Sequence, residues 1–177
     1  MTELELRIRE AIIDVPDFPI KGVIYKDITP IFQKPELCKA IVDAMAASFS
    51  SFKPDAVLGM ESRGFLLGMP LAIVLDVPFI MVRKKGKLPR SSYESSYALE
   101  YGTATIEMHK DALRAGQRVL IHDDVLATGG TAAAGADLVK QAGAEIAGFS
   151  FISELSFLKG RDRLASFSAP ISTFVSY

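Results

Sequence analysis

The fold is decided by the stretch Val119-Leu120-Ile121-His122-Asp123-Asp124-Val125-Leu126-Ala127-Thr128-Gly129-Gly130-Thr131. It begins as a short apolar run, which is typical of a strand buried on both faces, and the run ends at two adjacent carboxylates. A loop of small, hydroxyl-bearing and glycine residues follows, and the segment 132–144 is predicted to be a helix. A strand, a tight loop and a helix N-terminus form a common phosphate site, because the loop N–H groups can turn inward and the helix end adds partial positive charge.

The two acids of this stretch, Asp123 and Asp124, cannot bind a phosphate themselves, because like charges repel. At the carboxyl end of a strand they can accept hydrogen bonds from the hydroxyl groups of a sugar, or lie near a metal ion. The residues predicted to hold the phosphate are Ala127, Thr128, Gly129, Gly130 and Thr131. The stretch therefore predicts a site for ribose 5-phosphate, and the alternative is an ordinary strand-to-helix connection with two solvated acids.

Two commoner phosphate-binding motifs are absent from the sequence. Gly59 and Gly64 have the spacing of a P-loop, but Phe65 and Leu66 stand where Lys and Ser or Thr are required. No Gly-x-Gly-x-x-Gly follows a strand-like run, so a dinucleotide-binding fold has no fingerprint here.

The stretch 119–131 resembles the phosphoribosyl pyrophosphate (PRPP) signature of type I phosphoribosyltransferases, and its Ala-Thr-Gly-Gly-Thr ending resembles the adenine phosphoribosyltransferase branch. Further stretches resemble that branch, in the family's order, at 16–19, 27–30, 61–65, 82–89 and 96–102. The resemblance implies an α/β fold with a central, mostly parallel sheet flanked by helices, an N-terminal hood and a mobile loop. It also implies the reaction of adenine with PRPP to give AMP and pyrophosphate, with Mg²⁺ carried by PRPP or pyrophosphate and no metal ligands from the protein.

Length and composition predict one domain over residues 1–177. Within it, local pattern and the resemblance together give an N-terminal arm at 1–32, which the resemblance makes a hood, a core at 33–177 and a mobile loop at about 90–108. The net charge of −1 argues against a nucleic-acid partner, and Cys38, the single cysteine, excludes a disulfide framework. The N-terminus lacks the apolar segment of a signal peptide, and the longest apolar stretch, 65–75, is too short to cross a bilayer. We therefore expect a cytoplasmic protein with no membrane partner.

Hydrophobic periodicity predicts helices at 3–13, 35–52 and 65–75, buried strands at 56–60 and 148–153, and further strands at 78–82 and 171–175. A short helix or turn is expected at 155–164. Pro16, Pro19 and Pro30 predict an arm with little helix or strand, which by pattern alone packs on the core. The resemblance makes this arm a hood over the purine, with Tyr25 against the base, Ile24 and Lys26 reading its edge through their backbone, and Val125 also at the base. The family usually has Phe-Arg where this chain has Tyr25-Lys26, which puts any contact of the Arg side chain in doubt.

Arg63 lies in a second predicted strand–loop–helix unit and suits a bidentate contact with diphosphate oxygens. Residues 83–90 carry five cations, which usually indicates a solvated turn, and a nucleic-acid patch is disfavoured by the overall charge. The resemblance implies that Arg83, Lys84 and Lys87 reach the pyrophosphate, often across a homodimer interface.

Residues 91–102 are polar and rich in serine, which predicts a mobile loop with a return strand at 103–108. The resemblance places Glu100 and Tyr101 of this loop at the reacting groups. Enzymes for hypoxanthine and guanine carry an acid where this chain has Ala127, so Glu100 is hypothesised to be the general acid/base. His109 and His122 lack partners at metal-ligand spacing and are interpreted as structural. The alternatives are a transferase for another purine and a non-catalytic regulator that binds PRPP or AMP.

Overall fold

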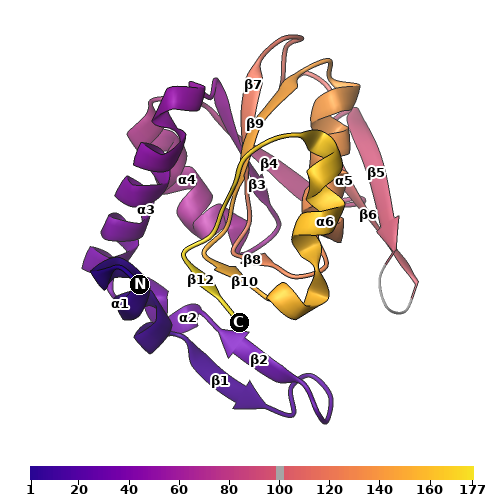
Figure 1. Cartoon of the computed structure of the whole chain (residues 1–177). Coiled ribbons are helices and arrows are strands. Elements are labelled where there is room, and N and C mark those ends of the chain that lie inside the picture. Colours follow the sequence, from indigo (N-terminus) through magenta and orange to yellow (C-terminus); the bar gives the residue numbers. More distant parts are fainter. Residues whose placement is uncertain (99–101) are drawn as a thin grey trace.

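A seven-stranded sheet with strand order β11-β9-β7-β3-β4-β6-β5 forms the centre of the molecule (Figure 1). The computed structural model of the chain describes residues 1–98 and 102–177. The strands of this sheet are β3 (Ala56–Met60), β4 (Phe79–Lys84), β5 (Ser92–Ala98), β6 (Thr103–His109), β7 (Arg118–His122), β9 (Glu145–Ser150) and β11 (Ile171–Ser172). The strands from β11 to β4 run parallel, whereas β6 and β5 are antiparallel to their neighbours. The predicted central, mostly parallel sheet is confirmed.

Helices cover both faces of the sheet, and its central strand β3 is accordingly apolar and buried at every position. The helices are α1 (Glu3–Ala11), α2 (Thr29–Phe32), α3 (Pro35–Phe49), α4 (Gly64–Leu75), α5 (Gly130–Gln141) and α6 (Gly160–Leu164). Val57 and Leu120 pack in one core cluster with α1, α3 and α4, whereas Leu58 and Ile121 pack in the other with α5. Alternate residues of one strand thus serve the two layers. Among the described residues, none of the helices has the length and apolar character needed to cross a membrane.

The N-terminal arm contains more regular structure than its prolines predicted. The strands β1 (Ile13–Pro16) and β2 (Ile24–Asp27) form an antiparallel hairpin, and α2 follows it. The prediction of little helix or strand is wrong, because Pro16 ends its strand and Pro30 lies in the first turn of α2, both positions that tolerate proline. Lys26 and Asp14 face each other across the hairpin, with their charged atoms 2.6 Å apart. The hairpin extends beyond the body of the molecule on the side where β8, β10 and β12 lie (Figure 1).

The segment predicted as loop at 91–102 is a strand over most of its length. Strand β5 pairs with β6 along all of its residues, and its tyrosines, Tyr93 and Tyr97, pack against the core beside α5. Serine and glutamate at the intervening positions hid this alternation, because only two large side chains point inward. Residues 99–101, which include Glu100 and Tyr101, lie outside the described residues.

A small parallel sheet of order β12-β10-β8 adjoins the hairpin, with β8 (Val125–Leu126), β10 (Ser153–Glu154) and β12 (Val175–Ser176). The strand predicted at 171–175 is therefore two short strands in different sheets, since the chain crosses from one sheet to the other between them. The single Nε–H of Arg161 is shared between the two carboxylate oxygens of buried Glu154, each 2.9 Å from Nε, so α6 is fixed to this sheet.

Candidate active site

A cleft of about 510 Å³ lies at the carboxyl ends of β3 and β7, where the two strand–loop–helix units open side by side. It is lined by residues of the hairpin, of the β3–α4 loop, of β5, of the β7–α5 segment and of the chain just after β10: Val23, Ile24, Tyr25, Lys26, Glu61, Ser62, Arg63, Tyr97, Asp123, Asp124, Val125, Ala127, Thr131 and Leu155. The structure therefore brings together the predicted purine residues, Arg63 and the acid pair.

A smaller hollow of about 50 Å³ adjoins the cleft and is formed by the glycine-rich loop. Its lining includes Thr128, Gly129 and Gly130, the predicted phosphate-binding residues that do not line the larger cleft. Gly129 has φ of +76° and α5 begins at the next residue, so the loop passes directly into the helix N-terminus. N–H groups at the start of a helix have no partner within the helix, and here the helix start lines a hollow of a size that suits a small anion.

Close packing against α6 holds the glycine-rich loop in this shape. A Cβ atom at Gly160 would lie 2.3 Å from the Ala127 carbonyl oxygen, and one at Gly129 would lie 2.7 Å from the Gly160 carbonyl oxygen. Both contacts are with backbone atoms that cannot rotate away. The start of α6 and the loop are therefore in contact through their main chains, and the Glu154–Arg161 pair fixes the helix that makes this contact.

The two carboxylates at the end of β7 lie on the cleft, but they are in different environments. Asp124 is 4% exposed, and its Oδ2 lies 2.6 Å from Arg63 Nε in an ion pair. Asp123 opens toward the cleft, and its Oδ1 accepts a hydrogen bond of 2.9 Å from the Asp124 N–H. Burial in the surrounding protein, with the neighbouring Asp124 charge as the second cause, raises the pKa of Asp123 well above its ordinary value. A hydrogen-bond donor or a cation bound in the cleft would therefore stabilise the ionised form of Asp123.

Arg63 joins the acid pair to the hairpin of β1 and β2. Its guanidinium lies over the Tyr25 ring, 5.6 Å from the centroid, and also contacts the Tyr25 hydroxyl. Lys26 lines the same cleft, but its ammonium pairs with Asp14 and lies 4.1 Å from the centre of the Tyr177 ring. The Lys26 side chain therefore fastens the hairpin to the C-terminus.

The predicted pyrophosphate residues are not all gathered in one place. Arg63 lines the cleft, whereas Arg83, Lys84 and Lys87 do not. Arg83 Nε lies 3.2 Å from Glu61 Oε2, and the Lys84 N–H donates to the same oxygen at 2.6 Å, so the basic segment begins beside the cleft. His122, interpreted as structural, is fully buried with Nδ1 3.1 Å from the Ser150 carbonyl oxygen, and burial lowers its pKa to about 4.

Sequence reasoning missed several lining residues, namely Val23, Glu61, Ser62, Tyr97 and Leu155. Glu61 and Ser62 adjoin Arg63 and were within reach of the same motif. Tyr97 and Leu155 come from segments read as a loop and as a short helix or turn, and nothing in their local pattern indicates the cleft.

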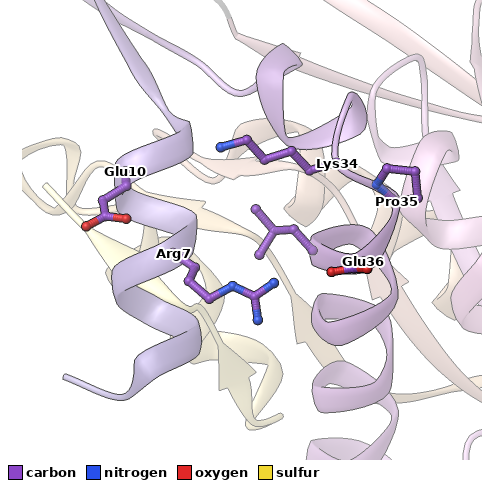
Figure 2. Close-up of a pocket in the computed structure, with 6 residues that line it drawn as sticks. Arg7, Glu10, Lys34, Pro35 and Glu36 are labelled. Atoms are coloured by element: carbon purple, nitrogen blue, oxygen red, sulfur yellow. The ribbon is translucent and has the colours of Figure 1, made fainter.

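A second surface hollow of about 480 Å³ lies between α1 and the start of α3 (Figure 2). Arg7 and Glu10 on α1 face Lys34, Pro35 and Glu36 across it, and the buried Leu37 also lines it. Its cations and acids are mixed and all are exposed, which is typical of a solvated surface between two helices.

Comparison with known proteins gives a consistent result. Residues 27–166 match the model of the phosphoribosyl transferase domain family. The chain is 51% identical to an adenine phosphoribosyltransferase of Cytophaga hutchinsonii over 98% of this chain and 96% of that protein. It is similar to the crystal structure of the adenine phosphoribosyltransferase of Rhodothermus marinus, with a TM-score of 0.92 and 49% identity over 98% of both chains. A Saccharomyces cerevisiae adenine phosphoribosyltransferase, complexed with an imino-altritol bisphosphate and adenine, has a TM-score of 0.92 and 40% identity, over 98% of this chain and 99% of that one.

The raised pKa of Asp123 predicts that this residue destabilises the ligand-free protein at neutral pH. Because the pKa of Asp123 is higher in the folded state, the unfolded chain releases this proton more easily. The free energy of unfolding of the protein therefore falls as pH rises from the ordinary pKa of the acid, about 4, through the raised value. The variant Asp123→Asn should therefore lack this decline and melt at a higher temperature than the wild type at pH 7. Thermal unfolding from pH 4 to pH 8 measures the effect.

The matched control is Asp137→Asn, which removes an exposed acid on α5 and should leave both the melting temperature and its pH profile close to wild type. A lower melting temperature for Asp123→Asn at pH 7 would show that the carboxylate stabilises the fold instead.

Proposed function

The chain belongs to the phosphoribosyl transferase family, and on this premise we propose that it transfers the phosphoribosyl group of PRPP to adenine, giving AMP and pyrophosphate. Its fold is that of the type I phosphoribosyltransferases. The observation that carries the proposal is a cleft lined by both the acid pair and the hairpin that bears Tyr25, with the hollow of the glycine-rich loop adjoining it. The reaction belongs to purine salvage.

The ribose 5-phosphate is proposed to bind through Asp123, Asp124 and the loop 127–131. Two carboxylates suit the ribose hydroxyls, which donate hydrogen bonds, while the loop amides and the Thr128 and Thr131 hydroxyls suit the phosphate. Fixing both ends of the sugar orients the anomeric carbon for in-line displacement.

The purine is proposed to lie between Tyr25 and Val125, with the backbone of Ile24 and Lys26 at its edge. All four residues line the cleft, and Val23 and Leu155 add apolar surface beside them. An aromatic ring and aliphatic side chains suit the two faces of a flat base. Adenine offers an amino donor beside a ring-nitrogen acceptor, which backbone groups can recognise.

The leaving pyrophosphate needs positive charge, and Arg63, Arg83, Lys84 and Lys87 are its proposed partners. Magnesium is the proposed cofactor, bound mainly by PRPP. The carboxylate oxygens of Asp123, Asp124 and Glu61 at the cleft could accept hydrogen bonds from the water molecules that such a hard cation keeps around it. The described residues contain no group of three or more His, Cys, Asp or Glu side chains placed to hold a metal.

Glu100 is proposed as the general acid/base at the purine and Tyr101 as its neighbour at the reacting groups. The support is the sequence motif at 96–102 together with Ala127, a cleft residue without an acidic side chain. Action in the cytoplasm likewise stays a prediction of the sequence.

A homodimer is proposed from one face of α4. Leu66, Met69 and Ile73 follow one another at helical spacing and are each about half exposed or more, and Met81 of β4 is 47% exposed. An uncovered apolar stripe of this kind marks a contact between proteins. Arg83 and Lys84 follow Met81 closely in the chain, so a partner seated here lies near the basic segment.

Turnover with free bases tests the proposed reaction. With PRPP and Mg²⁺, we expect AMP and pyrophosphate from adenine, at least 10²-fold faster than product from hypoxanthine, guanine or xanthine, because only adenine matches the edge pattern described above. Chelation of the metal should abolish turnover, and added Mg²⁺ should restore it. Faster reaction with another purine would favour a different transferase, and binding of PRPP or AMP without turnover would favour a regulator.

Replacing Glu100 tests the proposed acid/base. Glu100→Ala should lower kcat for adenine by about 10²-fold or more, because a positioned acid/base typically contributes that much. Glu145→Ala, at an exposed acid at the start of β9, serves as the control and should leave kcat unchanged. Full turnover by Glu100→Ala at saturating substrate would exclude the role.

Light scattering tests the dimer. The wild type should have the mass of two chains, and Ile73→Glu should have the mass of one, because a charge at the most exposed residue of the stripe on α4 opposes its burial. Phe157→Glu, at another exposed apolar residue away from α4, should remain dimeric. A monomeric wild type, or a dimer unaffected by Ile73→Glu, would contradict this interface.

A further inference from the structure

Glu107 is a buried acid on the face of the sheet where strand alternation places solvent-exposed residues. Its neighbours on β6, Ile106 and Met108, point into the core beneath α5, so Glu107 points the other way. Its cross-strand partner on β5, Glu94, is exposed, as expected for that face. Glu107 is nevertheless only 4% exposed.

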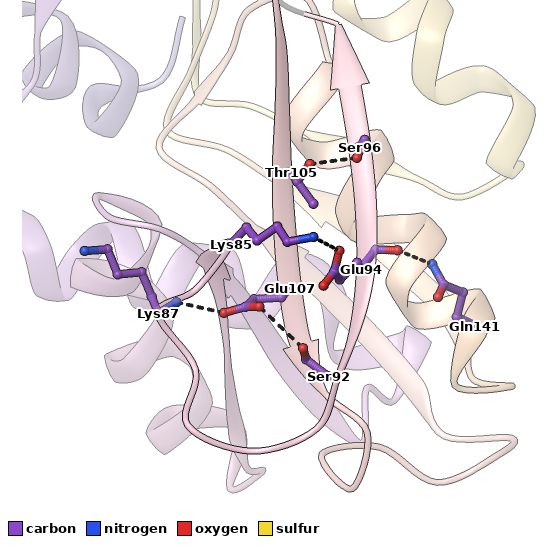
Figure 3. A network of polar contacts seen from close by, with 8 residues as sticks. All are labelled: Lys85, Lys87, Ser92, Glu94, Ser96, Thr105, Glu107 and Gln141. Atoms are coloured by element: carbon purple, nitrogen blue, oxygen red, sulfur yellow. Dashed lines mark hydrogen bonds and ion pairs between the residues drawn. The ribbon is translucent and has the colours of Figure 1, made fainter.

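The basic segment 83–90 covers Glu107 and donates its backbone N–H groups to it (Figure 3). Glu107 Oε1 accepts from the N–H of Lys87 at 2.9 Å and from that of Leu88 at 2.8 Å, and Oε2 lies 3.4 Å from the Ser92 hydroxyl. The segment turns at Gly86, whose φ is +81°, and the Lys87 N–H closes the turn on the Lys84 carbonyl oxygen at 3.2 Å.

The charge state of Glu107 fits this arrangement. Burial by itself raises the pKa of the carboxyl group, but the N–H groups of Leu88, Gly86 and Lys87 and the Ser92 hydroxyl outweigh it, and the net pKa is lowered. Glu107 is therefore a carboxylate at neutral pH, and its charge offsets the mutual repulsion of the cations folded around it.

The lysines of the turn differ in what their ammonium groups contact. Lys85 Nζ pairs with Glu94 Oε2 at 2.7 Å, whereas Glu107 binds Lys87 through its backbone, and the Lys87 ammonium points away from Glu107 (Figure 3). At the other end of the turn, Glu61 binds the backbone N–H of Lys84. The two acids therefore hold the main chain at Lys84 and Lys87, which leaves these side chains to extend from a fixed backbone.

We propose that Glu107 is a positioning residue for pyrophosphate, which acts by holding the turn 84–88 so that Lys84 and Lys87 are presented to the diphosphate group. This inference rests on the proposed phosphoribosyl transfer. Because the turn is already fixed, less conformational entropy is lost when the ligand binds. The acid therefore strengthens the binding of an anion without touching it. The benefit is confined to ligands with a diphosphate group, namely PRPP and pyrophosphate.

The test compares Glu107→Gln with Glu94→Gln, its exposed cross-strand partner. Glu107→Gln keeps the shape of the side chain but removes the charge and faces the turn with a group that has only one acceptor oxygen. We expect KM for PRPP and Kd for pyrophosphate to rise about tenfold, while KM for adenine and Kd for AMP change less than twofold. Glu94→Gln should leave all four constants within twofold of wild type.

A double-mutant cycle with Lys87→Gln tests whether Glu107 acts on pyrophosphate binding through Lys87. If Glu107 acts by presenting Lys87, the second substitution should weaken pyrophosphate binding much less in the Glu107→Gln background than in the wild type. Additive effects, an unchanged Kd for pyrophosphate, or an equal loss of AMP affinity would each overturn the inference. Should Glu107→Gln fail to fold, Glu107→Asp keeps the carboxylate but withdraws it from the turn, and the same selective loss is expected.

The wild type separates this inference from the proposed function. A wild type that turns over adenine with PRPP, combined with a Glu107→Gln variant of unchanged pyrophosphate affinity, defeats only the role of Glu107. A wild type without turnover defeats the proposed function.

Discussion

The ion pair between Arg63 and Asp124 joins the two strand–loop–helix units on which the cleft depends. The units meet closely, because a Cβ atom at Gly64 would lie 2.9 Å from the His122 carbonyl oxygen and 3.1 Å from Asp123 Oδ1. Glycine at this position lets the start of α4 approach the end of β7, and the approach brings the Arg63 side chain to Asp124. The acid pair, the glycine-rich loop and the hood are arranged around this contact, since Arg63 also reaches Tyr25.

Around the cleft, acids with little exposure bind segments that must present positive charge. Glu61 and Glu107 accept backbone N–H groups of the basic turn, and Glu154 holds Arg161 at the base of α6, next to the glycine-rich loop. Glu61 also pairs with the Arg83 side chain, whereas Glu107 binds the main chain at Lys87 and leaves the Lys87 ammonium unneutralised. Glu107 and Glu154 are almost fully buried, so their charges act inside the scaffold, whereas Lys84 and Lys87 are exposed.

The sequence predicted what local pattern determines and missed what packing determines. The apolar run at 119–122, its acids and the glycine-rich loop are contiguous. Their place at the cleft therefore followed from the rule that ligands bind at the carboxyl ends of parallel strands. The place of Tyr97 in the cleft was not predicted, because polar residues separate the inward positions of β5 and because the pairing of β5 with β6 is not indicated by local pattern. Leu155 reaches the cleft only through the small sheet in which β10 joins β8 and β12, a topology that no local periodicity specifies.

The departure at Tyr25-Lys26 from the family's usual Phe-Arg can now be placed in physical terms. The Tyr25 ring lines the cleft as a Phe ring can, and its added hydroxyl contacts Arg63 rather than the space for the base. The Lys26 ammonium is engaged by Asp14 across the hairpin and by the Tyr177 ring at the C-terminus. Both changes therefore act on how the hood is fastened to the core. The backbone of residues 24–26, which is proposed to read the purine, keeps its hairpin geometry whichever side chain does the fastening.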